Sequence, residues 1–187
     1  MERFAVLVVD AQNDFFPGGA LPVPEGDAIL PPLNALLARA REHDWPVITS
    51  RDWHPPDHSS FQAQGGPWPP HCVRGTRGAE LNGGLELPPV FTMVHKATRR
   101  DRDAYSAFDG TGLAEHLRRA GIGTLVVGGL ALDYCVKASC LDARREGFRV
   151  QLLLPATRAV EVNPGDGERA LAELREAGVE VLAELPR

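Results

Sequence analysis

The chain has 187 residues, a size at which one domain can still share a single hydrophobic core. Its formal net charge of -5, with both signs interspersed, argues against a nucleic-acid surface, which needs an excess of basic residues. The longest apolar runs, such as residues 4–9, are too short to cross a bilayer, and no basic-then-apolar leader is visible. We therefore expect one cytoplasmic domain over residues 1–187, with a small molecule as its partner and a homo-oligomer left open.

Six short β-rich segments alternate with helical patterns along the chain. Strands are predicted at residues 4–9, 46–50, 90–94, 124–127, 150–154 and 179–182. Apolar residues at helical spacing predict helices at residues 29–40, 113–120, 136–143 and 170–177. Strands that alternate with helices, several of them apolar on both faces, predict an α/β fold: a parallel six-stranded sheet between two helical layers.

The carboxyl ends of the strands are where such a sheet binds its ligands. Asp10, Asp52, Lys96 and the stretch 128–135 all lie just past a predicted strand. Residues 53–84 form a long segment rich in Pro, Gly and His without a clear period. Because loops of this length are usually functional or mobile, this segment is expected to contribute to a site.

Cys135 is the candidate nucleophile, since it follows two glycines at the start of a predicted helix. Asp133 is predicted as the N-cap, which would place Cys135 in the first turn. There the helix dipole should lower the thiol pKa, and free amide groups could hold an oxyanion. The alternative is that Cys135 is a buried structural cysteine. For Cys140, on the same helix, this structural interpretation is the preferred one. Cys72 completes an odd, sparse set that argues against disulfides.

Asp10 and Lys96 are the candidate acid–base partners of this thiol. Asp10 follows five apolar residues, so partial desolvation should raise its pKa toward the range useful for proton transfer. Lys96 beside a thiol would stabilise the thiolate. Taken singly, a turn aspartate and a surface lysine are the simpler interpretations. Their shared position at strand ends favours a common site.

A metal site is predicted from Asp52, His54 and His71. Side chains two residues apart in a strand point to one face, so Asp52 and His54 can converge on one ion, and His71 could return as a third ligand. Two imidazoles and a carboxylate with open positions suit one divalent ion, zinc in the first place, with iron or manganese as alternatives. His58 is left open as a fourth ligand, because its segment has the composition of an exposed turn.

Four stretches in the same order carry a resemblance to a known family: residues 9–15, 50–55, 66–73 and 128–136. The chain resembles the nicotinamidase/pyrazinamidase family of the isochorismatase-like cysteine hydrolases over nearly its whole length. The resemblance implies an isochorismatase-like form of the fold. It also implies hydrolysis of nicotinamide to nicotinate and ammonia through a cysteine thioester, in NAD salvage, with pyrazinamide as a further substrate.

The same resemblance implies roles for individual residues. It implies a triad of Asp10, Lys96 and Cys135, and a cis peptide bond before Ala131. The backbone N–H groups of Ala131 and Cys135 would then bind the oxyanion. The resemblance also implies that Asp52, His54 and His71 are the metal ligands.

The resemblance also implies that three aromatic residues line the ring pocket: Phe15, Trp68 and Tyr105. One position departs from the family's pattern. Leu132 stands where family members often carry a threonine, which bears on substrate preference more than on activity.

Three other readings stay open. A related hydrolase could act on another small amide, ureido or vinyl-ether substrate, although isochorismatase-type members generally lack the predicted metal site. A zinc hydrolase could use metal-bound hydroxide and keep Cys135 as a structural residue. A non-catalytic binding protein could keep the fold, but such proteins usually lose a member of the triad, and none is missing here.

Overall fold

The computed structural model of the chain describes residues 3–186 and contains a six-stranded parallel sheet in the order β3-β2-β1-β4-β5-β6. The strands are β1 (Arg3–Val9), β2 (Val47–Asp52), β3 (Thr92–Lys96), β4 (Ile122–Leu130), β5 (Arg149–Arg158) and β6 (Glu180–Leu182). The α-helices are α1 (Leu30–Glu42), α2 (Leu113–Arg119), α3 (Lys137–Arg145) and α4 (Asp166–Glu176). The predicted α/β class and six-stranded parallel sheet are confirmed.

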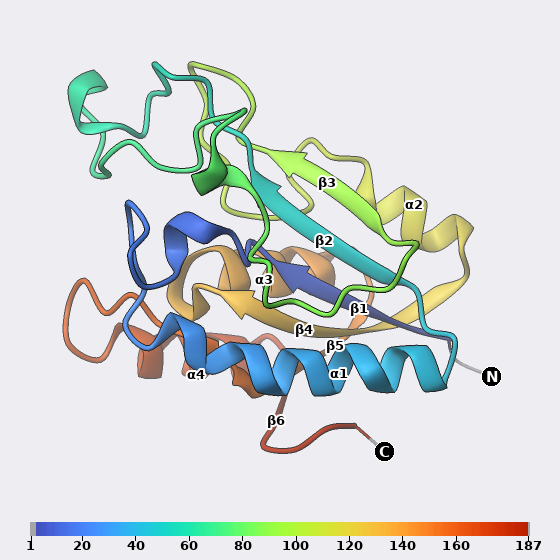
Figure 1. The fold of residues 1–187 in the computed structure, drawn as a ribbon. Helices are drawn as coiled ribbons and strands as arrows, with labels where there is room; N and C mark the ends of the chain where they lie inside the picture. Colours follow the sequence, from blue (N-terminus) through green and yellow to red (C-terminus); the bar gives the residue numbers. More distant parts are fainter. Residues whose placement is uncertain (1–2, 187) are drawn as a thin grey trace.

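Helices cover both faces of the sheet, as Figure 1 shows with α1 in front and α3 behind. Residues of β1 alternate between the two layers: Leu7 packs in the cluster that contains α2, α3 and α4, whereas Val8 packs in the cluster that contains α1. Both side chains are buried, which is why the strand is apolar without alternation. The three-layer arrangement is therefore set by the strand sequence.

Several observed elements differ in their bounds from the predicted ones; β5, for example, runs on to Arg158, and two further differences concern β3 and the third helix. Strand β3 begins at Thr92 and not at Val90, which is 85% exposed, because pairing with β2 starts at the Ile48–Thr92 pair. The third helix is preceded by a wider π-helical turn, Leu132–Val136. The prediction that Asp133 is the N-cap of this helix is wrong. The Asp133 carboxylate instead accepts hydrogen bonds from the N–H groups of Val160 and Glu161 at 2.8 and 3.0 Å.

The neighbours β1 and β4 are not consecutive in the chain, so the strand order reverses between them. Such a switch point leaves a crevice beyond the carboxyl ends of the strands. Gly129 allows close approach there: its φ is +123°, and a Cβ atom would lie 2.0 Å from the Val9 carbonyl oxygen. In Figure 1 the strands end on the side where the long connection from β2 to β3 lies.

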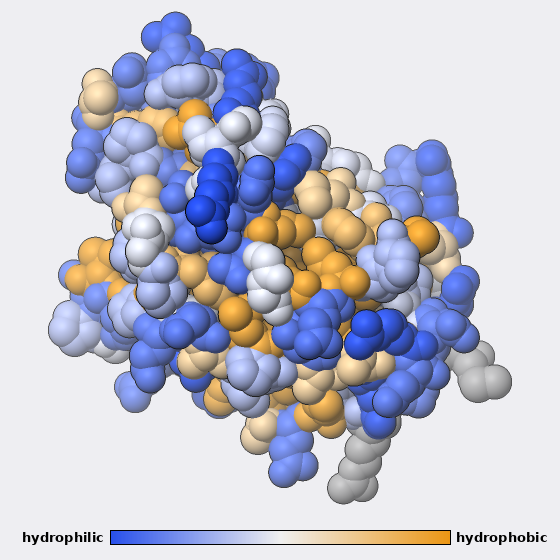
Figure 2. Space-filling view, in the orientation of Figure 1, coloured by the Kyte–Doolittle hydropathy of each residue, from blue (hydrophilic) through white to orange (hydrophobic). Residues whose placement is uncertain are grey.

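Figure 1 shows the connection from β2 to β3 crossing the sheet beside α1, and Figure 2 shows hydrophobic residues on the surface in this region. Leu85, Leu87 and Phe91 of this segment are partly buried against the α1 side of the core. This packing holds the long loop on the molecule although it contains no α-helix. Within residues 3–186, no helix has both the length and the apolar composition needed to span a membrane.

Burial of α1 against the sheet predicts a difference between two substitutions on that helix. Leu36 is fully buried, so Leu36→Ala should lower the free energy of unfolding by about 2–5 kcal/mol. Arg41→Ala removes only an exposed ion pair with Glu86 at 3.8 Å and should cost less than about 1 kcal/mol. Urea denaturation measures both, and equal losses would contradict this packing.

Candidate active site

The Lys96 ammonium group lies at the centre of a buried charge cluster beyond the strand ends. Its Nζ is 2.9 Å from Asp10 Oδ2, 2.5 Å from Asp52 Oδ1 and 3.3 Å from Cys135 Sγ. It also donates to the Ala104 carbonyl at 3.1 Å. The Lys96 side chain is completely buried, so these four groups replace its water shell. The structure thus brings the three predicted triad residues together and adds Asp52 to them.

Asp10 is held in place by the strand next to it. Its φ of +45° turns the chain away after β1, while its N–H donates to the Ser50 carbonyl at 3.2 Å. The Ser50 hydroxyl donates to Asp10 Oδ1 at 2.7 Å, so Oδ2 is the oxygen that faces the ammonium group. A carboxylate oxygen of Asp10, a carboxylate oxygen of Asp52 and the Cys135 sulfur all lie within 4.8 Å of one another.

A second cluster consists of Asp52, His54 and His71, all buried, whose ligand atoms lie within 4.8 Å of one another. His71 returns to the site because the chain pairs again with itself, with His54 and Val73 in a parallel bridge. Two ligands of one ion at about 2.1 Å are at most about 4.2 Å apart, so small adjustments would suffice to bind it. This cluster fits a divalent metal.

Hydrogen bonds orient both imidazole rings for that role. His54 Nδ1 lies 3.2 Å from the Ala97 carbonyl, and His71 Nδ1 lies 2.8 Å from the Pro69 carbonyl. A carbonyl partner makes Nδ1 the protonated nitrogen, which leaves Nε2 as the metal-binding atom. In His54 this Nε2 lies 3.6 Å from Asp52 Oδ2. Both imidazoles are therefore held by the backbone partners that usually orient metal-binding histidines.

His58 differs from what the sequence predicted. It is fully buried and not in an exposed turn, and its ring packs on that of His54 with centroids 4.2 Å apart. Its Nδ1 bonds to the Ser60 hydroxyl at 2.7 Å and its Nε2 to the Arg102 carbonyl at 3.1 Å. Since both nitrogens have partners, His58 packs behind the cluster and does not join it.

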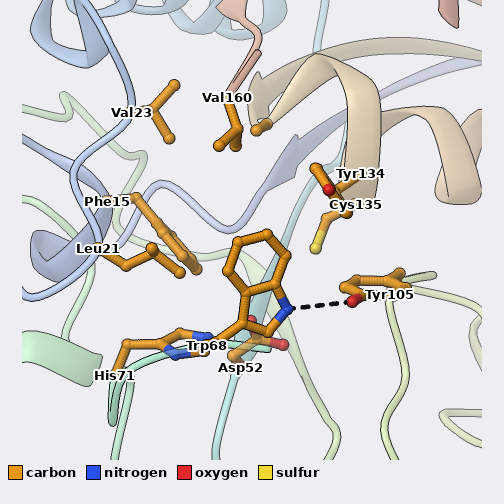
Figure 3. Close-up of a pocket in the computed structure, with 11 residues that line it drawn as sticks. Phe15, Leu21, Val23, Asp52, Trp68, His71, Tyr105, Tyr134, Cys135 and Val160 are labelled. Carbon is orange, nitrogen blue, oxygen red and sulfur yellow. Dashed lines mark hydrogen bonds between the residues drawn. The ribbon is translucent and has the colours of Figure 1, made fainter. Parts of the chain in front are cut away.

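A pocket opens between the two clusters, with a volume of about 370 Å³ including its mouth. Figure 3 shows Phe15 on one side, the Cys135 sulfur on the other and the Trp68 indole between them. Trp68 Nε1 donates to the Tyr105 hydroxyl at 3.1 Å, which links two loops across the mouth. Asp52 and His71 also line the pocket, so a flat ligand in it would lie near both the thiol and the Asp–His–His cluster.

The comparisons with known proteins agree with this arrangement. The isochorismatase domain model matches residues 4–184. The nicotinamidase of Escherichia coli is 38% identical, over 93% of this chain and 92% of that protein. The chain belongs to the nicotinamidase/pyrazinamidase group of the isochorismatase family.

Solved structures support the same assignment. The zinc complex of Pyrococcus horikoshii pyrazinamidase is 45% identical with a TM-score of 0.93, covering 98% of this chain and 99% of that one. A protein of L. infantum in complex with nicotinate is 38% identical with a TM-score of 0.88, covering 96% and 92% of the two chains. In this member of the family the Leu130–Ala131 peptide bond is cis, as the resemblance implied.

The pKa of the Cys135 thiol is raised, whereas its position in the helix predicted a lowered pKa. Burial raises this pKa well above its ordinary value, and the attraction of Lys96 only partly offsets burial. Burial also raises the pKa of Asp10, although Lys96 opposes that shift. A thiol that holds its proton thus lies beside a carboxylate that has become a better proton acceptor, so proton transfer between them is the chemistry this pair can do.

Lys96 and Asp52 form the charged pair of the site. Burial alone would lower the pKa of Lys96, but Asp10, Asp52 and Cys135 hold it well above its ordinary value. Burial alone would raise the pKa of Asp52, but Lys96 and His54 hold it below its ordinary value. Asp52 therefore contributes a permanent negative charge to both clusters at once.

Sequence reasoning missed several residues of this family member's site. Leu21, Val23, Tyr134 and Val160 line the pocket, although each has the pattern of an ordinary loop or core residue. Asp14 also escaped notice: its carboxylate accepts the Cys72 N–H at 2.7 Å and so secures the loop that carries His71. An acidic residue in a loop gives no local signal of such a distant bond, which spans 58 positions of the chain.

Removal of the Lys96 charge should destabilise the protein far more than removal of a surface lysine. Lys96→Met leaves two buried carboxylates uncompensated and should cost about 3–5 kcal/mol of unfolding free energy. Lys137→Met removes a partly exposed ion pair with Glu173 at 3.0 Å and should cost less than about 1 kcal/mol. Urea denaturation of both variants tests this difference, and a Lys96→Met variant as stable as its control would refute the charge network.

Proposed function

We propose that this chain hydrolyses nicotinamide to nicotinate and ammonia, a step of NAD salvage, with Cys135 as the nucleophile. One observation carries the proposal: a buried ammonium group contacts both a carboxylate and a thiol, and the thiol lines an aromatic pocket. The E. coli relative is named a nicotinamidase, and the L. infantum protein binds nicotinate; both indicate that nicotinamide is the substrate. Pyrazinamide, a similar flat carboxamide, is the second expected substrate.

In the first half of the reaction Cys135 Sγ gives its proton to Asp10 and bonds to the carboxamide carbon. The carbonyl oxygen becomes an oxyanion, to which the backbone N–H groups of Ala131 and Cys135 donate hydrogen bonds. Asp10 then passes its proton to the amine nitrogen as the carbon–nitrogen bond breaks. Ammonia leaves, and a thioester between Cys135 and the pyridine carbonyl remains.

In the second half Asp10 takes a proton from water while the water oxygen bonds to the thioester carbon. The carbon–sulfur bond breaks, the sulfur regains a proton, and nicotinate leaves. Lys96 stays protonated throughout, because three anionic or polarisable groups surround it. Its role is to hold the sulfur and the carboxylate in position and to balance their charge.

We assign the Asp52, His54 and His71 cluster to one divalent metal, with zinc as the proposed ion. When bound, the metal would supply a Lewis-acid docking point for the pyridine nitrogen. Phe15 and Trp68 present aromatic faces to the flat ring, and Tyr105 holds Trp68 through its hydroxyl. The zinc in the P. horikoshii relative supports this ion, and elemental analysis of the purified protein distinguishes it from iron and manganese.

The thiol role predicts opposite results for two cysteines near each other in the chain. Cys135→Ala should lower kcat for nicotinamide by at least about a thousandfold, because no other group can form the thioester. Cys140 is buried in the core, where burial raises its pKa to about 12, so Cys140→Ala should leave kcat within a few fold of wild type. Ammonia release measures both. Wild-type turnover by Cys135→Ala would point to metal-bound hydroxide as the nucleophile.

The docking role of the metal predicts a difference in affinity between nicotinamide and benzamide, which differ only in the ring nitrogen. The metal-loaded protein should bind nicotinamide much more tightly, whereas the two amides should bind alike after chelation. Calorimetric titration of Cys135→Ala, which cannot turn the ligands over, measures this difference, and zinc added back is the control. An unchanged preference after chelation would refute docking through the metal.

A further inference from the structure

Gln12 is a buried polar residue that the mechanism above does not use. It lies two positions beyond Asp10 and its side chain is inaccessible to solvent. Its Nε2 donates to the carbonyl of Asp52 at 2.8 Å and to the carbonyl of Ala79 at 2.9 Å. Its Oε1 accepts the N–H of Asp52 at 2.8 Å. One side-chain amide therefore satisfies both backbone groups of a single residue, Asp52.

The position of these bonds explains why a side chain makes them. Strands β1 and β2 pair through the Val8–Thr49 pair, and the last backbone bond is from the Asp10 N–H to the Ser50 carbonyl. In a strand the N–H and C=O of every second residue point to the same neighbour, so those of Asp52 also point toward β1. By then β1 has ended, because Asp10 turns the chain away with φ +45°.

The primary amide of glutamine has the same donor and acceptor as a peptide group. Gln12 thus continues the β1–β2 ladder for one more residue with its side chain. On the other side Asp52 is the register partner of Lys96 of β3, and the backbone bond there is made by the next residue, since the Trp53 N–H donates to the Lys96 carbonyl at 3.1 Å. Without Gln12, both backbone groups of Asp52 would face the end of β1 and lose the bonds that hold them.

We infer that Gln12 is a positioning residue, which fixes the Asp52 backbone so that the Asp52 carboxylate serves the Lys96 ammonium group and the metal cluster together. The two carboxylate oxygens are directed to different partners: Oδ1 lies 2.5 Å from Lys96 Nζ and Oδ2 lies 3.6 Å from His54 Nε2. A small rotation of the Asp52 backbone would move both oxygens away from both partners. This inference rests on the proposed metal site.

The chain also contains a matched control for the same bonding pattern. Asn34 on α1 donates from Nδ2 to the Gly84 carbonyl at 2.8 Å and accepts the Glu86 N–H at Oδ1 at 2.9 Å. This side-chain amide also clamps a loop backbone, but it contacts neither cluster. Loss of the Asn34 clamp should thus affect stability alone.

The test measures zinc affinity by competition with a chromophoric chelator, and melting temperature alongside it, in Gln12→Met and Asn34→Leu. Both substitutions keep approximate size and remove the hydrogen bonds. Gln12→Met should weaken zinc binding by about 10- to 100-fold, the usual effect of loss of a partner behind a metal ligand. Asn34→Leu should bind zinc as wild type does, even where its melting temperature falls. The Co²⁺ absorption spectrum should change in Gln12→Met alone.

Zinc affinity within twofold of wild type in Gln12→Met would overturn the inference, since the bonds to Asp52 would then be structural only. If Gln12→Met does not fold, Gln12→Glu replaces it, with Asn34→Asp as its control. The glutamate keeps one acceptor but donates nothing, so it should also weaken zinc binding, and wild-type affinity there overturns the inference equally. A wild-type protein that binds no zinc would instead refute the metal proposal, and the role of Gln12 with it.

Discussion

The buried Lys96 ammonium group is the interaction on which the site depends. A carboxylate pair as close as Asp10 and Asp52 cannot stay buried and ionised without a cation between them, because each charge loses its hydration. Lys96 supplies that cation at 2.9 and 2.5 Å and also reaches the Cys135 sulfur. The acid–base pair and the metal cluster are therefore parts of one electrostatic unit, joined through Asp52.

The sheet topology explains why these groups meet. Asp10, Asp52 and Lys96 follow or end the three adjacent strands β1, β2 and β3, and Cys135 follows β4 on the far side of β1. Parallel strands place all their carboxyl ends at one edge, and the reversal of strand order between β1 and β4 opens the crevice. Residues up to 125 positions apart in the chain are thus neighbours without any specific loop to bring them together.

Loops around the crevice are held by side chains that bond to distant backbone groups. Asp14 accepts the N–H groups of Cys72 and Ala20, and Gly78 leaves room for its carboxylate, since a Cβ atom there would lie 2.1 Å from Asp14 Oδ2. Asp133 holds the loop after β5 in the same way. These bonds give the long connection from β2 to β3 a defined shape in place of secondary structure, which is how His71 and Trp68 reach the pocket.

The sequence by itself determined the order and type of most elements and the identity of the residues at the strand ends. Hydrophobic periodicity is a local property, so the sequence alone reveals it. The carboxyl ends of a parallel sheet share one edge by geometry alone. What only the tertiary structure decided were properties that depend on burial and on distant partners. The Cys135 thiol has a raised pKa because desolvation outweighs the helix position, and His58 is buried with both nitrogens bonded. Gln12 and Asp52 meet across 40 positions of the chain. Desolvation and long-range bonds arise when the chain packs, and no spacing within one segment encodes them.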